Sequence, residues 1–362
     1  FTSPVQAKVA HNIMNCKTGA YGANVCVCED CGFVQIHYNS CRNRCCPMCQ
    51  AVPKEMWMDA RREDVLDAPY FHLVFTVPDI LNPVIYSNQR LLYDALYHAA
   101  SSTISELTAD PKHLGAKVGY ICILHTWGSE MNFHPHIHTI LLGGGLASNN
   151  QWKDNGENFF LPIRVISKMF RGKYLEELKR LWEEDKLVFH GTAEKFRNHY
   201  TFKELLDSCY GMDWIPHCKK TFNGAQTVIK YLGKYTHRIA VSNHRIVRMD
   251  DDTVTFLVKD YRNEGQWKEL TISGVEFVRR FLMHVPPRRF VRIRHYGLLC
   301  SRTKSQKLTL CRNLLGCKKY LSKLRDMEMP EILEHLYGIK VCVCKACGGH
   351  LGKPQMRMPL RC

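Results

Sequence analysis

The sequence lacks the features that mark membrane and exported proteins. It has no apolar run of about eighteen residues, as a membrane-spanning helix requires, and no signal-peptide pattern at its start. It also lacks an internal repeat and a low-complexity tract, which argues against repeat architectures and long disordered segments. We therefore expect a soluble, cytoplasmic protein. Because the sequence starts at Phe1 rather than Met, we expect its natural termini to lie outside it.

Acidic residues are scarce relative to basic ones. Fifty Lys and Arg face thirty-four Asp and Glu, a net charge of +16, which favours a polyanionic partner, nucleic acid first. A basic protein of the membrane surface is the alternative class, and the missing apolar runs count against it. With 362 residues, 45% of them hydrophobic, the chain exceeds one ordinary domain, so we expect a catalytic body with smaller appendages.

Cysteine, in contrast, is abundant, and its pattern predicts zinc rather than disulfides. The eighteen cysteines of this long chain cluster near its two ends, several in CxxC pairs, as reduced metal-binding thiolates do. In a small module over residues 1–55, two such pairs predict one tetrahedral zinc site: Cys28, Cys31, Cys46 and Cys49. Four more cysteines there could form a second site or stay free thiols: Cys16, Cys26, Cys41 and Cys45. Cys344 and Cys347 resemble another zinc knuckle whose partners stay open.

A strand over residues 133–142 predicts a second kind of metal site. Alternation along a strand puts His136 and His138 on one face, with Cα atoms roughly 6.6 Å apart, where two neutral imidazoles can bind one divalent ion. The three glycines after this run predict a turn. A neighbouring strand over residues 118–126 would form an antiparallel hairpin with it and place His125 beside the pair. We expect His125 to be the third metal ligand. The alternative is that His125 has a core or capping role, in which case His134 or Glu130 would be the third ligand.

Two tyrosines stand out in a helix predicted over residues 224–238. Tyr231 and Tyr235 are four residues apart, so their rings share one face with Cβ atoms about 5–6 Å apart. Aromatic pairs at this spacing usually serve packing. The neighbouring cations favour contact with a phosphodiester instead: Lys230, Lys234, His237 and Arg238.

A basic and aromatic strand follows near residue 290. Alternation would place cations and rings on one face, where guanidinium groups meet phosphates and rings stack on bases of single-stranded nucleic acid. The residues of this face are Arg288, Phe290, Arg292, Arg294 and Tyr296. A solvated edge strand is the alternative. We expect a catalytic domain over residues 56–300, with a helical insertion at about 165–222, and a basic helical tail with a zinc knuckle over residues 301–362.

Taken together, these motifs resemble a known family. Phe75-Thr76-Val77-Pro78, His136-Ile137-His138 and Tyr231-x-x-x-Tyr235 are similar to the three motifs of HUH endonucleases. With the cysteine module in front, the chain closely resembles the two-tyrosine transposases of bacterial rolling-circle insertion sequences. The resemblance implies an α+β fold: a ferredoxin-like antiparallel HUH sheet with helical insertions, preceded by a small zinc module.

The same resemblance implies the chemistry and the partners. Mg²⁺ or Mn²⁺ on the histidines would polarise a scissile phosphate, and a tyrosine would attack it to leave a 5′-phosphotyrosine. The DNA would be single-stranded, namely hairpin-bearing transposon ends and target DNA, and the protein would act at the bacterial nucleoid. A relaxase or rolling-circle replication initiator, and a non-enzymatic zinc-finger DNA-binding protein, are the alternatives. The oligomeric state stays open.

Overall fold

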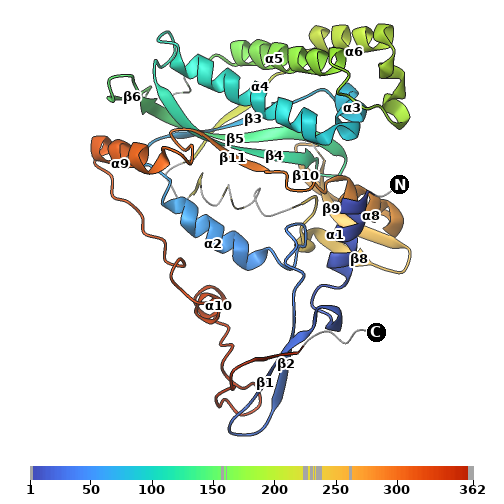
Figure 1. Ribbon diagram of the computed structural model, residues 1–362, viewed down its shortest axis with the longest axis vertical. Coiled ribbons are helices and arrows are strands. Elements are labelled where there is room, and N and C mark those ends of the chain that lie inside the picture. The colour runs from blue at the N-terminus through green and yellow to red at the C-terminus, as the bar shows by residue number, and fades with distance from the viewer. Residues whose placement is uncertain are drawn as a thin grey trace.

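The structure, a computed structural model, describes residues 3–155, 159, 161–222, 227–228, 231, 233, 239–260 and 263–357. Over these residues its centre is a six-stranded antiparallel sheet in the order β11-β4-β5-β3-β7, with β6 paired to β5 (Figure 1). The strands are β3 (Tyr70–Thr76), β4 (Lys117–Trp127), β5 (Phe133–Leu146), β6 (Trp152–Asp154), β7 (His217–Phe222) and β11 (Ile293–Gly297). The expected α+β class with an antiparallel sheet is confirmed.

Helices cover one face of this sheet (Figure 1). They are α3 (Asn82–Ser87), α4 (Gln89–Ala109), α5 (Ile163–Glu183) and α6 (His199–Gly211). Residues of α4 at helical spacing, such as Leu92 and Leu96, pack with Phe71 and Phe75 of β3 in one buried core. Helices α5 and α6 fall in the stretch where a helical insertion is expected, and β7 at the end of that stretch pairs with β3 as an edge strand. No helix of the described residues combines the length and apolarity needed to span a bilayer.

The opposite face of the sheet carries the histidines. It packs against α2 (Ala51–Arg62) and α9 (Lys304–Leu315), with Met58, Leu308 and Tyr231 in a second, smaller core. Strand alternation separates the two faces: Ile137 belongs to the helix-covered core, whereas His136 and His138 lie opposite. The central sheet therefore has one mainly apolar face and one face that mixes apolar and imidazole side chains.

A second sheet lies beside the first. It consists of β8 (Ile246–Met249), β9 (Thr253–Asp260) and β10 (Gln266–Ser273), and it packs with α1 (Pro4–Met14) and α8 (Gly274–Met283). Strand β9 pairs antiparallel with β8 on one side and with β10 on the other. Ser273 caps α8 by accepting a 3.2 Å hydrogen bond from the Glu276 amide. The Glu276 carboxylate forms ion pairs with Arg279 and Arg280.

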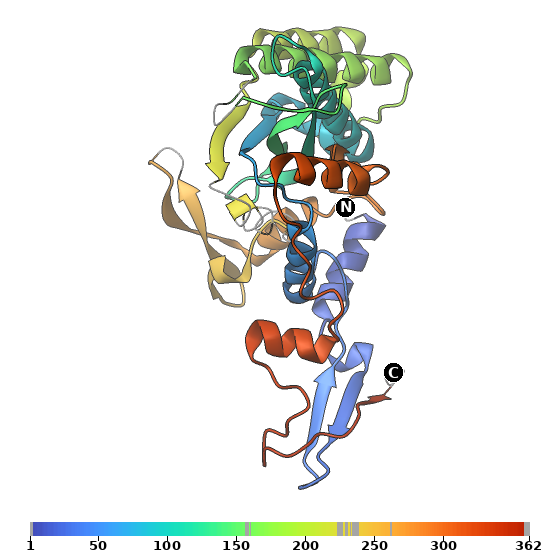
Figure 2. The same cartoon turned by 90° about the vertical axis from the view of Figure 1, so that its left-hand side faces the viewer.

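The third sheet joins the two ends of the described chain. Strands β1 (Ala23–Val27) and β2 (Val34–Tyr38) form a hairpin, and β12 (Gln355–Arg357) pairs with β1. This sheet lies at the far end of an elongated molecule, as Figure 2 shows. The stretch expected as a basic helical tail, residues 301–362, contains α9, which packs on the central sheet, and α10 (Met329–Tyr337). The last described residues join the amino-terminal module through β12.

The glycine triplet in β5 does not form the expected turn. Strand β5 continues through Gly143, Gly144 and Gly145 to Leu146 and pairs with β4 and β6. A Cβ on Gly143 would lie 2.9 Å from a ring carbon of Phe71, and one on Gly145 would overlap the Lys117 carbonyl oxygen. These glycines are required by close approach of neighbouring groups rather than by a turn.

Candidate functional site

Three histidines meet on the face of the β4–β5 hairpin that lies opposite the helix-covered core. His125 is the antiparallel partner of His136, and Ile123 is that of His138. The three side chains are buried, and their ligand atoms all lie within 4.8 Å of one another. The prediction that the hairpin places His125 beside the pair is confirmed as geometry. The two substitutes are elsewhere: His134 pairs with Asp79 at 3.1 Å, and neither it nor Glu130 joins this group.

Burial sets the charge of these rings. It lowers the pKa of His136 to about 4 and lowers the pKa of His138 well below its ordinary value. Both imidazoles are neutral at neutral pH, so each has one nitrogen lone pair. His136 Nδ1 lies 2.7 Å from the His134 carbonyl oxygen and donates to it, which leaves the lone pair on Nε2. The Nε2 atoms of His136 and His138 face each other at 3.0 Å, as two ligands that converge on one cation would.

A tyrosine and a fourth histidine complete this site. The Tyr231 hydroxyl lies 2.6 Å from His72 Nε2 and 3.3 Å from His138 Nδ1. His72 Nε2 is also 2.9 Å from His138 Nδ1. With His72 Nε2 as the acceptor, both the phenol and His138 Nδ1–H can donate to it, and His138 Nε2 keeps its lone pair. The phenol is thus linked through His72 to His138, a member of the histidine cluster.

The sequence-based reasoning missed His72. Strand β3 alternates, so the inward positions of Phe71 and Leu73 place His72 on the opposite face, and Val74 is the partner of His138. This alternation was the available signal, but only the pairing of β3 with β5 brings His72 to His138. The other predicted residues of the tyrosine helix, Tyr235, Lys230, Lys234, His237 and Arg238, lie outside the described residues.

The cysteines form two clusters, and neither has the expected membership. One consists of Cys16, Cys41, Cys46 and Cys49, the other of Cys28, Cys31, Cys344 and Cys347. The predicted quartet that joined Cys28 and Cys31 to Cys46 and Cys49 is wrong. Its two pairs sit at opposite ends of the β1–β2 hairpin, whose five-residue strands span about 17 Å. Cys26 and Cys45 belong to neither cluster; burial raises the pKa of the Cys45 thiol.

The predicted nucleic-acid face around residue 290 also needs correction. Phe290 is 2% exposed and packs edge-on against Tyr93 of α4. Arg294 pairs with Asp94 of α4, and Tyr296 stacks on Tyr120 at 5.2 Å. Strand β11 begins only at Ile293, so the predicted alternation over residues 288–296 is wrong and these residues do not share one face. Helix α4 covers the face that carries Arg294 and Tyr296, so these side chains are engaged by the protein itself. Arg292 lies over the Trp127 ring.

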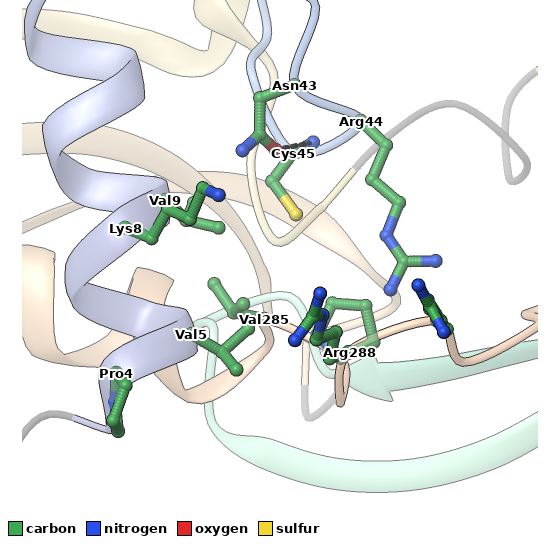
Figure 3. A pocket seen from close by; sticks show the side chains of 11 residues that line it. Pro4, Val5, Lys8, Val9, Asn43, Arg44, Cys45, Val285 and Arg288 are labelled. Atoms are coloured by element: carbon green, nitrogen blue, oxygen red, sulfur yellow. Dashed lines mark hydrogen bonds between the residues drawn. The ribbon is translucent and has the colours of Figure 1, made fainter.

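Arg288 belongs instead to a cationic cavity. The cavity has a volume of about 600 Å³ (Figure 3). It lies between α1, the loop that carries Asn43, Arg44 and Cys45, and the segment after α8. Lys8, Arg44, Arg288 and Arg289 line it and are exposed at the surface. Arg44 is held in place by donating to the carbonyl oxygens of Phe290 and Pro287, at 2.6 and 3.1 Å.

Family models and relatives identify the chain. The family model described as "Putative transposase" (Y2_Tnp) matches residues 119–307, more than half of the chain, and the model described as "Transposase zinc-binding domain" matches residues 2–77. The protein "Putative transposase y4qJ" of Sinorhizobium fredii is 39% identical over 348 residues, which are 95% of this chain and 87% of the relative. The chain belongs to this transposase family.

A second relative is the transposase of a named insertion sequence. The transposase for insertion sequence element IS801 of Pseudomonas savastanoi pv. phaseolicola is 30% identical over 309 residues, 84% of this chain and 72% of that protein. The resemblance to two-tyrosine transposases of rolling-circle insertion sequences is thereby confirmed, with the class of DNA strand-transfer enzyme and a zinc-binding domain at the amino-terminal end.

Solved structures add a weak likeness. The metal-free conjugative relaxase TrwC in complex with oriT DNA aligns with a TM-score of 0.26 and 12% identity, over 45% of the transposase and 71% of that chain. Its metal-bound complex aligns with a TM-score of 0.23 and 17% identity, over 30% and 43%. Scores this low carry no conclusion about the transposase.

Proposed function

We propose that the transposase nicks and rejoins single-stranded DNA through a covalent phosphotyrosine, with Tyr231 as a nucleophile. One observation carries this assignment: the Tyr231 hydroxyl lies 2.6 Å from His72 Nε2, beside a cluster of three further histidines. A tyrosine that only packs has no need of a buried base. Hairpin-bearing transposon ends and target DNA are the expected substrates.

The residues account for each bond in the reaction. A phenol with a pKa of about 10 is a weak nucleophile at pH 7, and His72 Nε2 would accept its proton. The phenolic oxygen then attacks phosphorus, the bond to the 3′ oxygen breaks, and that oxygen leaves as a hydroxyl with a proton from water. In the reverse step a 3′-hydroxyl attacks the phosphotyrosine, so rejoining needs no nucleotide cofactor. Tyr235, the second predicted nucleophile, would repeat the cycle at another DNA end.

The histidine cluster would hold the divalent ion of this reaction. His125, His136 and His138 offer imidazole nitrogens, and the group contains no carboxylate among the described residues. When bound, the ion would polarise the scissile phosphate and offset the charge that develops there. Imidazole nitrogen suits transition-metal ions, of which Mn²⁺ binds it most weakly, whereas Mg²⁺ prefers oxygen ligands. This donor set therefore favours Mn²⁺ of the two expected ions.

The remaining sites would hold zinc and DNA. Cys16 and Cys41 lie 3.5 and 3.6 Å from Cys49, sulfur to sulfur, as tetrahedral zinc ligands do, and Cys46 completes the quartet. The cationic cavity would bind DNA phosphates through Lys8, Arg44, Arg288 and Arg289.

A covalent-adduct assay tests the nucleophile. Single-stranded oligonucleotides with a transposon end, labelled at the 5′ or 3′ side, are incubated with the protein and Mn²⁺ and resolved on denaturing gels. We expect the sequence on the 3′ side of the nick to stay on the protein. The variant Tyr231→Phe keeps the ring and should lose the adduct that maps to residue 231 by peptide mass spectrometry. Tyr200→Phe, at a 76% exposed position on α6, is the matched control. A phosphopeptide at another residue only, unchanged by Tyr231→Phe, would overturn the assignment.

A further inference from the structure

Two CxxC pairs from opposite ends of the chain meet in the structure. Cys28 and Cys31 lie at the tip of the β1–β2 hairpin, and Cys344 and Cys347 lie after α10. Their four sulfur atoms lie within 4.8 Å of one another. Cys28 Sγ is 3.5 Å from Cys347 Sγ, and Cys31 Sγ is 3.8 Å from Cys344 Sγ. The matched zinc-binding family model covers residues 2–77 and so includes only the first pair.

The two pairs have the same backbone geometry. In each, the first cysteine amide donates to the carbonyl five residues later, and the glycine after the second cysteine donates back to the first cysteine. These bonds are Cys28 to Phe33 (2.9 Å), Cys344 to Gly349 (2.8 Å), Gly32 to Cys28 (3.1 Å) and Gly348 to Cys344 (3.0 Å). Gly32 and Gly348 both have positive φ, 68° and 78°, which glycine adopts without strain. Two matching turns of this kind indicate two zinc knuckles that face each other.

The distances fit one metal ion. Tetrahedral zinc with Zn–S bonds of about 2.3 Å separates its sulfurs by about 3.8 Å, close to the 3.5 and 3.8 Å observed. A disulfide would require about 2.05 Å. Backbone amides also donate to sulfur, from Ala346 to Cys344 and from Gly349 to Cys347, both at 3.4 Å, as is favourable around metal-bound thiolates. Cys342 is exposed and is not part of the group.

The apolar core around the four cysteines is too small to stabilise this part of the chain without a metal. The buried apolar group there comprises Cys26, Cys28, Cys344 and Leu351. Main-chain hydrogen bonds add to it, from the Gly352 amide to Val27 and from the Glu29 amide to His350. A core of this size supplies little free energy, so a bound metal would supply most of it.

We propose that Cys28, Cys31, Cys344 and Cys347 bind one zinc ion that fastens the carboxy-terminal segment of the transposase to its amino-terminal module. Figure 1 shows the path that this ion closes: from the hairpin through α2 to the central sheet, then from α9 past α10 back to the hairpin. The site lies at the tip of the molecule, away from the histidine cluster (Figure 2), so it is independent of the proposed cleavage chemistry.

Zinc stoichiometry of the full chain tests whether the two pairs share one ion. Zinc per chain is measured by mass spectrometry for Cys28→Ser with Cys31→Ser, for Cys344→Ser with Cys347→Ser, and for all four changes together. Each set should lose one equivalent, and the fourfold variant should lose no more than either pair. Cys342→Ser, which changes a neighbouring cysteine outside the cluster, should lose none. A loss of two equivalents in the fourfold variant, or of none in either pair, would refute the shared site.

Two further variants separate loss of the ion from loss of folding. Cys347→His keeps a metal ligand and should retain the equivalent with an altered Co²⁺ spectrum, whereas Cys347→Ala should lose it. In a third variant, a protease site inserted after Gly338 releases a fragment that the ion should hold on the protein until a strong chelator is added. A Co²⁺ spectrum identical in parent, His and Ala variants, or a fragment that leaves before chelation, contradicts the proposal.

Discussion

One nitrogen atom, His72 Nε2, links Tyr231 to the histidine cluster. His72 Nε2 is close to both the Tyr231 hydroxyl and His138 Nδ1. Because His136 donates through Nδ1 to a carbonyl oxygen, its Nε2 is fixed as the acceptor. With His72 Nε2 as the acceptor, the proton of the phenol has a defined destination.

We expect His72→Gln to slow adduct formation. A positioned general base contributes about 10²–10⁴-fold, so the reduction in rate at pH 7 should fall in that range. Initial rates of adduct formation at pH 7 measure this reduction. His98→Gln, at an exposed position of α4, is the control; a parent-like rate in His72→Gln would remove the base from the mechanism.

Metal affinity should distinguish His136 from His134. His136→Ala removes one of the three converging ligands, so Mn²⁺ affinity should fall by more than the 10–100-fold that is typical of losing an outer partner. His134→Ala should leave affinity nearly unchanged, because its ring pairs with Asp79. Titration calorimetry of zinc-loaded protein measures both, and parent Mn²⁺ should bind more tightly than Mg²⁺. Equal Mn²⁺ affinity in the His136→Ala variant and the parent would mean that the ion binds elsewhere.

At the scale of elements, β5 organises the catalytic body. It pairs with β3, β4 and β6, and its histidines lie on one face while Ile137 and Leu141 lie in the core. Its length depends on the glycine triplet, because side chains there would collide with neighbouring strands. The same strand therefore carries the histidines near one end and the closely packed glycines at the other.

Replacing a glycine of β5 should cost stability. The Cβ of Gly145→Ala would meet the backbone of Lys117, so we expect a decrease of about 1–3 kcal/mol in the free energy of unfolding. Gly172→Ala is the matched control, since its Cβ meets nothing within 4 Å on helix α5, and it should gain about 0.5–1 kcal/mol. Urea unfolding measures both. Equal midpoints for Gly145→Ala and the parent would show that the strand relaxes at no cost.

Substitutions at and just before β11 should distinguish arginines that bind DNA from an arginine that packs. Arg288→Ala with Arg289→Ala should lower the slope of log affinity against log salt by about 0.7 for each phosphate that the variant no longer binds. Arg294→Ala, which breaks the pair with Asp94, should reduce stability and leave that slope unchanged. Fluorescence anisotropy with a single-stranded oligonucleotide at several salt concentrations tests both. A parent slope in the double variant would exclude the cavity as a DNA site.

At the scale of the whole molecule, the carboxy-terminal segment ties the modules together. Asp59 of α2 is 4% exposed and accepts hydrogen bonds from the Tyr320 hydroxyl, the Ser322 hydroxyl and the Leu324 amide, at 2.7, 2.6 and 3.0 Å. Burial opposes ionisation of this carboxyl, but the hydrogen bonds prevail and lower its pKa below the ordinary value. The tail therefore docks midway along its path as well as at the cysteine cluster.

Asp59→Asn should loosen this docking. An amide cannot accept all three bonds as well as a carboxylate, so the local stability should fall by about 1–3 kcal/mol. Since folding lowers the pKa, the parent interaction is present above the unfolded pKa of about 3.9 and disappears as pH falls through the lower folded value. Hydrogen exchange of residues 317–328 should therefore rise in the variant at pH 7 and in the parent only at acid pH. Asp207→Asn, at an exposed position of α6, is the control; unchanged exchange in Asp59→Asn would contradict the role of this carboxyl.

The sequence by itself determined the local geometry of this protein. Alternation placed His136 and His138 on one face, and the turn after Gly128 made the hairpin that brings in His125. The motifs also identified the transposase family. Each of these features depends on residues close in the chain, or on strands joined by a short turn, where backbone periodicity fixes which side chains meet.

Only the tertiary structure decided which distant segments share a site. The CxxC spacing is the same at Cys28, Cys46 and Cys344, so the pairing of Cys28 with Cys347 depends on the path of the intervening chain. Similarly, alternation cannot tell which face of β11 is covered, and helix α4 buries Phe290 and engages Arg294. His72 reaches Tyr231 only because β3 pairs with β5. Periodicity specifies the direction of a side chain along its own element, whereas its partner is set by how the elements pack.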